Sequence, residues 1–452
     1  MKLTITKNAQ RLKALGEDLT SFQDNSCEVI FLDDAVTAKN GLFNFFKEAY
    51  RVLNPGGILR IRSDNLKKNL SFKCEKLDPY EQFIELKNDW LDGQISESFL
   101  LRVLNLTGFL IVRRGDNHHL EAVKESQELK AQLPLVTIAI PAYKSEFYEF
   151  SLITAMGQSY LNFEVLIADE GVDGKIESIT SNYLRRFPHI RVRYIKHSKP
   201  LGEVGNFEFC RANAKGVYLK YLDDDDVLDP DCVLRFVRAF EAFKDSVTLV
   251  SARRDPIDSF NNPVEHSTMS YYPLFQNLTY AHGKEIIELS LNQVANRIGE
   301  PTVFMFRRDD TDTHLTKFHD SEYPCSLDLV LAFKLLIKGN FIYIPETLSF
   351  YRVHVNQSSK EEKNFFHGHN VWANMILGFT KRYSLFSDKS EYVMGLHRVV
   401  NLLESYLKKR PETEYGQLLN ESLFKLIKEL ENHKGFKPKE KVLKDFFSLE
   451  FN

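Results

Sequence analysis

The chain has few cysteines and no long apolar run, and both absences narrow its class. Its 452 residues include five cysteines, which are far apart and show no C-x-x-C spacing. An odd, scattered set argues against a disulfide framework or a zinc–thiolate site and suits a reducing compartment. No run of about 18 uncharged apolar residues occurs, so we expect no membrane-spanning helix. The first residues, MKLTITKNAQ, lack the apolar centre of a signal peptide. We therefore expect a cytoplasmic protein.

An excess of charge of one sign is also missing. The formal net charge is −3, from 59 basic and 62 acidic residues, so no broad basic field indicates a nucleic-acid partner. Hydrophobic residues make up 43% of the chain and charged residues 27%, which is typical of a globular protein. The length exceeds that of one ordinary core and favours two or three domains.

Four regions differ in their pattern. Residues 1–115 alternate short apolar runs with helical stretches. Residues 116–133 are charged with helical propensity, and we interpret them as a linker helix. Residues 134–359 alternate strands with helices, and residues 360–452 are helical without a convincing strand. We expect three domains in this order, joined by the linker.

The third region predicts an α/β fold with a mostly parallel sheet. Strands are expected at 135–141, 163–169, 191–197 and 216–222, with a helix at 147–156. Candidate site residues stand at the ends of three of these strands: Pro141, Ala142 and Tyr143; Asp169 and Glu170; and Asp223, Asp224, Asp225 and Asp226. Ligands of such sheets bind beyond the carboxyl ends of the strands, so we expect one crevice there.

The run of four aspartates is the sharpest feature. Adjacent carboxylates repel one another, and a cation offsets that repulsion. Mg²⁺ and Mn²⁺ prefer oxygen ligands, commonly one or two carboxylates together with substrate phosphates. The alternative is a solvated acidic turn, with Asp226 or Asp229 capping a helix that starts near Pro230.

Four segments stand out within residues 134–357, which make up about half of the chain: VTIAIPAYK, QSYLNFEVLIADEG, LGEVGNFEFCRANAKGVYLKYLDDDDVLDPD and SLDLVLAFKLLIKGNFIYIPETLSFYRVHVNQSS. These segments, in this order, resemble the inverting family 2 glycosyltransferases, which have the GT-A fold. The resemblance implies a metal-dependent transferase of the hexosyl or N-acetylhexosaminyl class. It would move a sugar from a nucleotide donor, by family habit UDP, to a hydroxyl of a glycan or lipid-linked acceptor, using Mn²⁺ or Mg²⁺.

The resemblance also implies roles for residues of the donor site. The nucleotide would be bound by Pro141, Ala142, Tyr143, Asp169, Glu170 and Asn206. The chain has Asp-Glu where the family usually has Asp-Asp, so which carboxylate meets the base stays open. A plain strand stop is the alternative for Pro141, and a helix-surface position is the alternative for Asn206.

The same resemblance assigns the metal and the diphosphate. Asp225 would bind the metal, with Asp223 as the other acid of the DxD motif. Asp223 or Asp224 would hold the ribose. His354 would complete the metal shell and Arg352 would meet diphosphate oxygens. An ordinary strand-to-loop pair is the alternative for His354 and Arg352.

On the acceptor side, Asp328 matches the family's base, which removes the proton of the attacking hydroxyl. A favourable charge at a helix N-terminus is the alternative, with Ser326 as the better cap. Leu327 replaces the family's usual Glu and removes a neighbouring charge. Gly299, Glu300 and Pro301 lie where the family places a loop beside the acceptor.

The N-terminal region contains DNSCEVIFLDDAV and EAYRVLNPGGILRIRSDN, which resemble the second half of a class I methyltransferase. Such enzymes bind S-adenosylmethionine with a glycine-rich turn after the first strand. Only Gly16 precedes Cys27, so we expect neither cofactor binding nor methylation, and we expect a partner-binding or scaffolding role. A bifunctional glycosyltransferase and methyltransferase is one alternative, and a non-catalytic nucleotide-sugar-binding module is another.

The C-terminal region has apolar positions at helical spacing, as in VVNLLESYLKK and LNESLFKLIKELE. This pattern indicates core packing or a homo-oligomer contact. Aromatic and basic elements such as FTKRYSLF favour the alternative of peripheral contact with a membrane, at its inner face.

Overall fold

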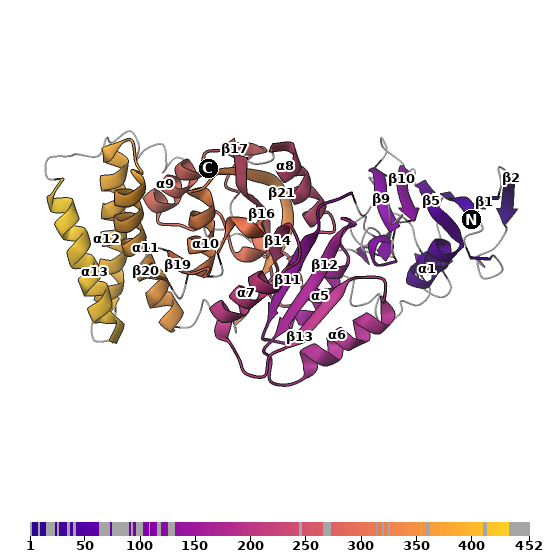
Figure 1. Ribbon diagram of the computed structural model, residues 1–452, viewed down its shortest axis with the longest axis horizontal. Helices are drawn as coiled ribbons and strands as arrows, with labels where there is room; N and C mark the ends of the chain where they lie inside the picture. Colours follow the sequence, from indigo (N-terminus) through magenta and orange to yellow (C-terminus); the bar gives the residue numbers. More distant parts are fainter. Residues whose placement is uncertain are drawn as a thin grey trace.

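The structure is a computed structural model of the chain. It describes residues 2–7, 10–14, 23–24, 27–33, 37–38, 42–62, 73–74, 90–91, 94–95, 103–107, 109–114, 119–124, 132–243, 246–264, 273–312, 314–318, 321–323, 326–355, 357, 362–409 and 414–433. Figure 1 shows an elongated molecule, with the N-terminal sheet at one end, the large sheet in the middle and the C-terminal helices at the other end.

The N-terminal region forms a six-stranded sheet in the order β2-β1-β3-β5-β10-β9. Its strands are β1 (Lys2–Lys7), β2 (Gln10–Ala14), β3 (Cys27–Asp33), β5 (Leu53–Arg62), β9 (Phe109–Arg114) and β10 (His119–Lys124). Of the ladders within this sheet, β3 with β5 is parallel and the others are antiparallel. Helix α1 (Leu42–Val52) precedes β5 and buries Phe46 and Ala49.

Part of the predicted linker helix, residues 116–133, is a strand in the structure: β10 (His119–Lys124). Residues His119–Lys124 pair with β5 on one side and with β9 on the other. Ala122 is fully buried opposite Leu59. Two strand partners satisfy the backbone of this short segment, and this tertiary pairing overrides its helical propensity. The N-terminal sheet therefore continues past residue 115.

The central sheet has nine strands. Eight of them follow the order β13-β12-β11-β14-β18-β16-β21-β15, and β17 pairs with β21. The strands are β11 (Val136–Ala142), β12 (Phe163–Asp169), β13 (Val192–Lys196), β14 (Tyr218–Tyr221), β15 (Val227–Leu228), β16 (Val247–Ile257), β17 (Thr279–Ala281), β18 (Phe304–Arg307) and β21 (Asn340–Arg352). The first four in this order run parallel, and β18 is antiparallel to both of its neighbours. The four predicted strands are confirmed.

Both faces of this sheet are covered, which explains its apolar strands. Val136, Ile138 and Ile140 of β11 belong to one core cluster, while Ala139 belongs to a second. Successive side chains of a strand point to opposite faces, so the two clusters lie on opposite sides of the sheet. The helices of this region are α5 (Tyr148–Met156), α6 (Lys175–Arg186), α7 (Gly202–Asn213), α8 (Cys232–Phe243), α9 (Gly283–Gln293) and α10 (Leu327–Leu336).

The C-terminal helices α11 (Glu362–Tyr383), α12 (Lys389–Lys409) and α13 (Glu414–Glu431) pack side by side (Figure 1). Their apolar residues Met375, Leu396 and Leu419 belong to the same cluster as one face of the central sheet. Arg398 Nη1 donates to Asn292 O at 2.9 Å and joins α12 to α9. The helical tail therefore extends the core of the central domain. Among the described residues, no helix is long and apolar enough to span a membrane.

Candidate functional site

The acidic run and the loop after β11 meet through one carboxylate. Asp224 Oδ2 accepts hydrogen bonds from the main-chain N–H groups of Tyr143 at 2.7 Å and Lys144 at 2.6 Å. Burial and the nearby charge of Asp225 raise the pKa of Asp224 to about 7. The predicted convergence of these two clusters is confirmed.

The acidic run is anchored from two further directions. Thr302 Oγ1 accepts a hydrogen bond from the N–H of Asp223 at 3.0 Å, and Asp226 Oδ1 accepts one from the N–H of Arg352 at 3.0 Å. Burial, and then the neighbouring carboxylates, raise the pKa values of Asp223 and Asp226 well above their ordinary range. Such a crowded set of acids is the environment that an added cation stabilises.

Asp225 and His354 form the candidate metal pair. Oδ2 of Asp225 lies 2.9 Å from Nε2 of His354, and the Asp225 side chain is 22% exposed. Within the described ranges, no group of three or more His, Cys, Asp or Glu is arranged to bind a metal ion. The donor set still fits Mg²⁺ or Mn²⁺, because these ions are commonly bound by few protein groups together with substrate phosphates and water.

Arg352 lies directly behind the acidic run. The residue is fully buried, its Nε donates to Asp225 O at 2.7 Å and its Nη1 donates to Asp258 O at 2.8 Å. Its guanidinium also lies over the Phe147 ring, 4.6 Å from the ring centroid. Through these bonds Arg352 supports the acidic run, while its Nη2 has no hydrogen-bond partner among the described residues.

Asp169 is the last residue of β12 and Glu170 follows it, and the carboxylates of both accept hydrogen bonds from neighbouring residues. Asp169 is fully buried, and its Oδ1 accepts from the N–H of Gly171 at 2.7 Å, while its Oδ2 accepts from the Tyr194 hydroxyl at 2.5 Å. Oε2 of Glu170 accepts from the N–H of Leu201 at 2.8 Å and of Gly202 at 3.1 Å. Both acids thus shape the loops that surround them.

Gly171 brings the loop after β12 against the loop after β11. A Cβ at this glycine would lie 2.8 Å from Ile176 Cδ1 and 3.0 Å from Tyr143 O. Ala142 is fully buried at the end of β11, whereas Tyr143 is exposed. Pro141 is the last residue but one of β11, which ends at Ala142.

Asn206 does not lie on a helix surface. It is buried, its Nδ2 donates to Ala168 O at 3.0 Å, and its Oδ1 lies 3.1 Å from His197 Nε2. These contacts fasten α7 to the end of β12. With both ends of its amide engaged, Asn206 supports the end of β12, which carries Asp169.

Asp328 lies in the first turn of α10, close to the loop expected beside the acceptor. Its Oδ2 accepts a hydrogen bond from Asn296 Nδ2 at 2.6 Å. Burial raises the pKa of Asp328, and the negative charge of Glu300 adds to the effect. Ser326 has the N-cap position of α10 but makes no capping bond with its side chain. Glu300 Oε2 pairs with Arg254 Nε at 3.0 Å.

The segment 296–302 links the two halves of the site, and sequence reasoning missed its two key residues. Asn296 contacts Asp328, and Thr302 contacts Asp223. Thr302 belongs to the 3₁₀ helix η4 (Pro301–Val303), which also contains Pro301. Neither residue belongs to a motif, so only their closeness to Gly299 in the sequence gave a signal.

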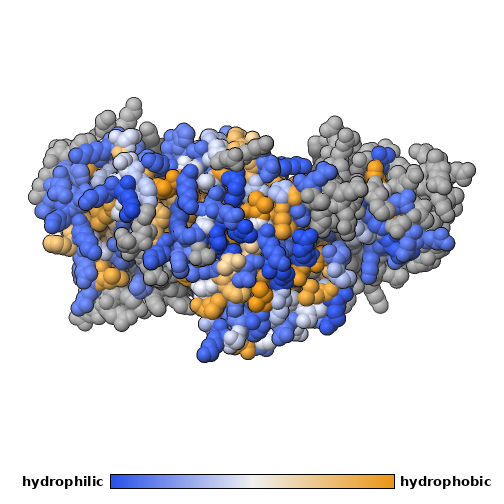
Figure 2. Space-filling model, in the orientation of Figure 1, coloured by the Kyte–Doolittle hydropathy of each residue, from blue (hydrophilic) through white to orange (hydrophobic). Residues whose placement is uncertain are grey.

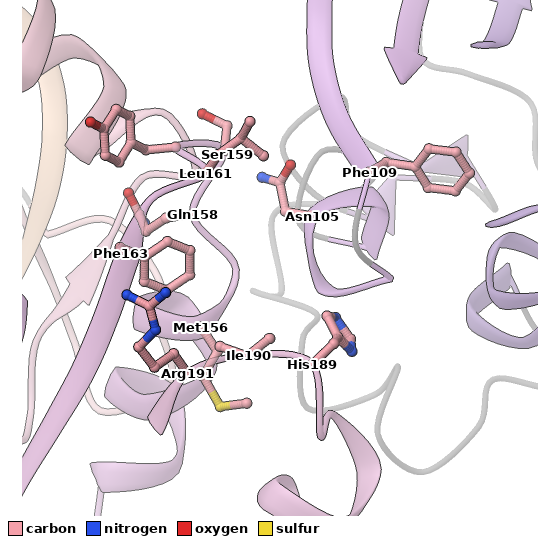
Figure 3. A pocket seen from close by; sticks show the side chains of 11 residues that line it. Asn105, Phe109, Met156, Gln158, Ser159, Leu161, Phe163, His189, Ile190 and Arg191 are labelled. Atoms are coloured by element: carbon pink, nitrogen blue, oxygen red, sulfur yellow. The ribbon is translucent and has the colours of Figure 1, made fainter. Parts of the chain in front are cut away.

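A pocket of about 40 Å³ lies away from these residues. Its lining combines Asn105 and Phe109 of the N-terminal region with residues before β12 and β13, such as Ser159 and Arg191 (Figure 3). Asn105 Nδ2 donates to Gly157 O at 3.0 Å across this contact. The pocket therefore marks where the N-terminal sheet meets the amino ends of the central strands, opposite the candidate site.

Comparison with known families gives the central region its assignment. Residues 137–315 match the profile described as Glycosyl transferase family 2. The chain carries a family 2 glycosyltransferase domain. Its mostly parallel, curled sheet is that of the GT-A glycosyltransferases. Residues 2–61 match the profile described as Methyltransferase domain, which agrees with the resemblance of the N-terminal region.

Several relatives carry glycosyltransferase names. An uncharacterized glycosyltransferase of Rickettsia felis is 24% identical over 285 residues, which are 60% of this chain and 43% of that protein. The chondroitin synthase of Escherichia coli is 37% identical over 114 residues, 24% of this chain and 16% of that protein. The chain therefore spans less than half the length of either relative.

Among solved structures, S. aureus TarS 1-349 in complex with UDP-GlcNAc has 14% sequence identity and a TM-score of 0.42. The alignment covers 68% of this chain and 93% of that one. The mannosyltransferase PcManGT from Pyrobaculum calidifontis, in complex with GDP-Man and Mn²⁺, has 13% identity and a TM-score of 0.39, covering 66% of this chain and 87% of that one.

Proposed function

We propose that the chain is an inverting, metal-dependent glycosyltransferase that takes a sugar from a UDP donor. The observation that carries the proposal is the meeting of three elements at the carboxyl edge of the sheet. Asp224 joins the loop after β11 to the acidic run, and Asp225 lies against His354 in that run. Ligands of open α/β sheets bind at this edge.

On the donor side, Tyr143 and the loops around Asp169 and Glu170 would receive the nucleotide, with Asp223 or Asp224 toward the ribose. Asp225 and His354 would bind Mn²⁺ or Mg²⁺. Such an ion neutralises the charge that develops on a diphosphate leaving group. Arg352 would act indirectly, since its bond to Asp225 O fixes the main chain from which that carboxylate projects.

On the acceptor side, Asp328 would receive the proton of the attacking hydroxyl. The hydroxyl oxygen forms a bond to the anomeric carbon while the bond from that carbon to the diphosphate breaks, and attack from the opposite side inverts the centre. The loop of Gly299, Glu300 and Pro301 would border the acceptor. A glycan or lipid-linked acceptor, a cytoplasmic setting at the inner face of a membrane, and a homo-oligomer remain predictions.

Turnover of a UDP-sugar panel, measured as UDP release with Mn²⁺ and again with EDTA, tests the proposal. We expect release for at least one sugar, and loss of it with EDTA. The Asp328→Asn variant should lose release while it still binds UDP. An Asp328→Asn variant as active as the wild type would instead favour another base, and UDP binding without any turnover would favour the binding-module alternative.

For the N-terminal region we propose a scaffolding role. Asn105 donates a hydrogen bond to Gly157 O of the central domain at the contact described above. The family match covers residues 2–61 only, where Gly16 is the one glycine before Cys27. Calorimetric titration with S-adenosylmethionine should give no heat of binding. Tight binding would overturn this role and support the bifunctional alternative.

A further inference from the structure

The side chain of Asn296 lies between Asp328 and the loop of residues 299–301. Its Nδ2 donates to Asp328 Oδ2 at 2.6 Å and to Gly299 O at 3.2 Å. Its Oδ1 accepts from the N–H of Gly299 at 3.1 Å. One amide thus uses both donor hydrogens and its acceptor, and it contacts the candidate base and the candidate acceptor loop together.

These contacts fix which way the amide points. The N–H of Gly299 can only donate, so the atom of Asn296 that faces it must be the oxygen. The nitrogen then faces Asp328, and the contact at 2.6 Å is a donated bond to the carboxylate. A neutral donor at this position stabilises the ionised carboxylate without adding a charge to the site.

The loop is also restrained on its other side. Gly299 has a φ of 109°, which side chains disfavour, and a Cβ there would lie 2.2 Å from Arg254 Nη1. Arg254 in turn pairs with Glu300 through Nε at 3.0 Å. The loop is therefore clamped between Arg254 and Asn296, and its position determines where the amide meets Asp328.

We propose that Asn296 is a positioning residue for the base, orienting the carboxylate of Asp328 so that Oδ1 faces the acceptor hydroxyl. The inference rests on the proposed function, in which Asp328 is the base. Asn296 Nδ2 donates to Asp328 Oδ2, which leaves Oδ1 of Asp328 to accept the hydroxyl proton. The proton passes to Oδ1 as the new glycosidic bond forms and the bond to the diphosphate breaks. The donated bond to Oδ2 persists after the proton arrives. The same amide ties the base to the loop that borders the acceptor.

The Asn296→Asp variant separates positioning from simple packing. Asp has the same shape and keeps an oxygen for the N–H of Gly299, but it places a second carboxylate against Asp328. We expect UDP release to fall on the order of tenfold to hundredfold, as for other small misplacements of a reacting group. The acid side of its pH profile should move to higher pH, and UDP affinity should stay within about twofold of the wild type, because the change lies outside the donor site.

Asn213→Asp is the matched control. Asn213 Nδ2 donates to Phe209 O at 2.9 Å on α7, so this variant removes a similar bond and adds the same charge away from Asp328. It should keep both the rate and the pH profile of the wild type. Equal losses of rate in the two variants, with unchanged pH profiles, would mean that Asn296 only packs and would overturn the proposal.

A second measurement does not depend on activity. Carboxyl ¹³C NMR of aspartate-labelled protein follows the titration of Asp328, with the Asp328→Asn variant assigning its signal. We expect the pKa of Asp328 to rise in Asn296→Asp, or in Asn296→Ala if the first variant does not fold. An unchanged titration would overturn the inference. If the titration of Asp328 shifts in the variant as expected but the wild type releases no UDP, the proposed function is contradicted and the contact between Asn296 and Asp328 still stands.

Discussion

The carboxylates of the donor half and of the acceptor half of the candidate site have opposite surroundings. Four consecutive aspartates crowd the donor half, and burial raises the pKa of Asp223 and Asp226 well above the ordinary range. The acceptor half presents Asp328 with a neutral amide donor at 2.6 Å. A crowded set suits a cation and its diphosphate, whereas one carboxylate with a fixed donor suits proton transfer. The charge of each half therefore matches a different step.

The largest expected effect is on the acceptor half. Asp328→Asn removes the group that accepts the proton and should lower UDP release about a thousandfold, the middle of the range for general bases. UDP affinity should be retained, because the change leaves the acidic run intact. UDP release at fixed enzyme concentration and calorimetric titration with UDP measure the two quantities. Loss of both UDP release and UDP affinity would mean that the donor half and the acceptor half do not act separately.

Arg352 tests the support behind the donor half. Arg352→Met keeps much of the volume but removes the bonds to Asp225 O and Asp258 O. We expect the free energy of unfolding to fall by about 3 kcal/mol, since buried carbonyls lose their partner, and UDP affinity to fall with it. Chemical denaturation gives the first quantity. The surface variant Arg235→Met serves as control, because Arg235 is exposed and pairs with the exposed Glu346.

The pH dependence of turnover sharpens the comparison further. A base must be ionised to work, and burial raises the pKa of Asp328 above the ordinary aspartate value. Activity should therefore be full above the raised pKa and should fall as the pH drops through it, at a higher pH than for an exposed aspartate. A profile of kcat/KM against pH checks this. A fall only near the ordinary aspartate pKa would show that burial does not tune the base.

The smallest effect is expected at the contact with the N-terminal sheet. Asn105→Ala removes the bond to Gly157 O and should destabilise the folded chain by about 1 kcal/mol. UDP affinity and turnover should not change, because this contact lies at the amino ends of the strands. Thermal unfolding and UDP release measure both. A large loss of turnover would show that the N-terminal region acts on the site.

The sequence predicted the central fold well because its strands are buried on both faces. β11 and β12 are mostly apolar and lead into the candidate site residues, a pattern that can be recognised without knowledge of the packing. The segment His119–Lys124 was predicted wrongly because its partners β5 and β9 are set by tertiary pairing. Figure 2 shows apolar and polar residues interspersed over the face of the central domain seen in this view.

The candidate site likewise contains residues that motifs predict and residues that only the fold places there. The acidic run and Asp328 belong to motifs, whereas Asn296 and Thr302 reach them only through the fold of residues 296–302. Arg352 also belongs to a motif, but the motif does not say that its guanidinium is buried behind Asp225. A motif predicts which residues gather at a site, and packing decides which of them face the ligand.

The most direct test of the account is calorimetric titration of UDP into the full chain, with and without Mn²⁺. We predict binding that depends on Mn²⁺ and that disappears in Asp225→Ala, because Asp225 and His354 would bind the ion that holds the diphosphate. The Asp309→Ala variant, which removes an exposed acid that pairs with Arg308 beside the amino end of β14, should bind as the wild type does. Binding of UDP that is equally strong without metal, or that survives in Asp225→Ala, would contradict the account.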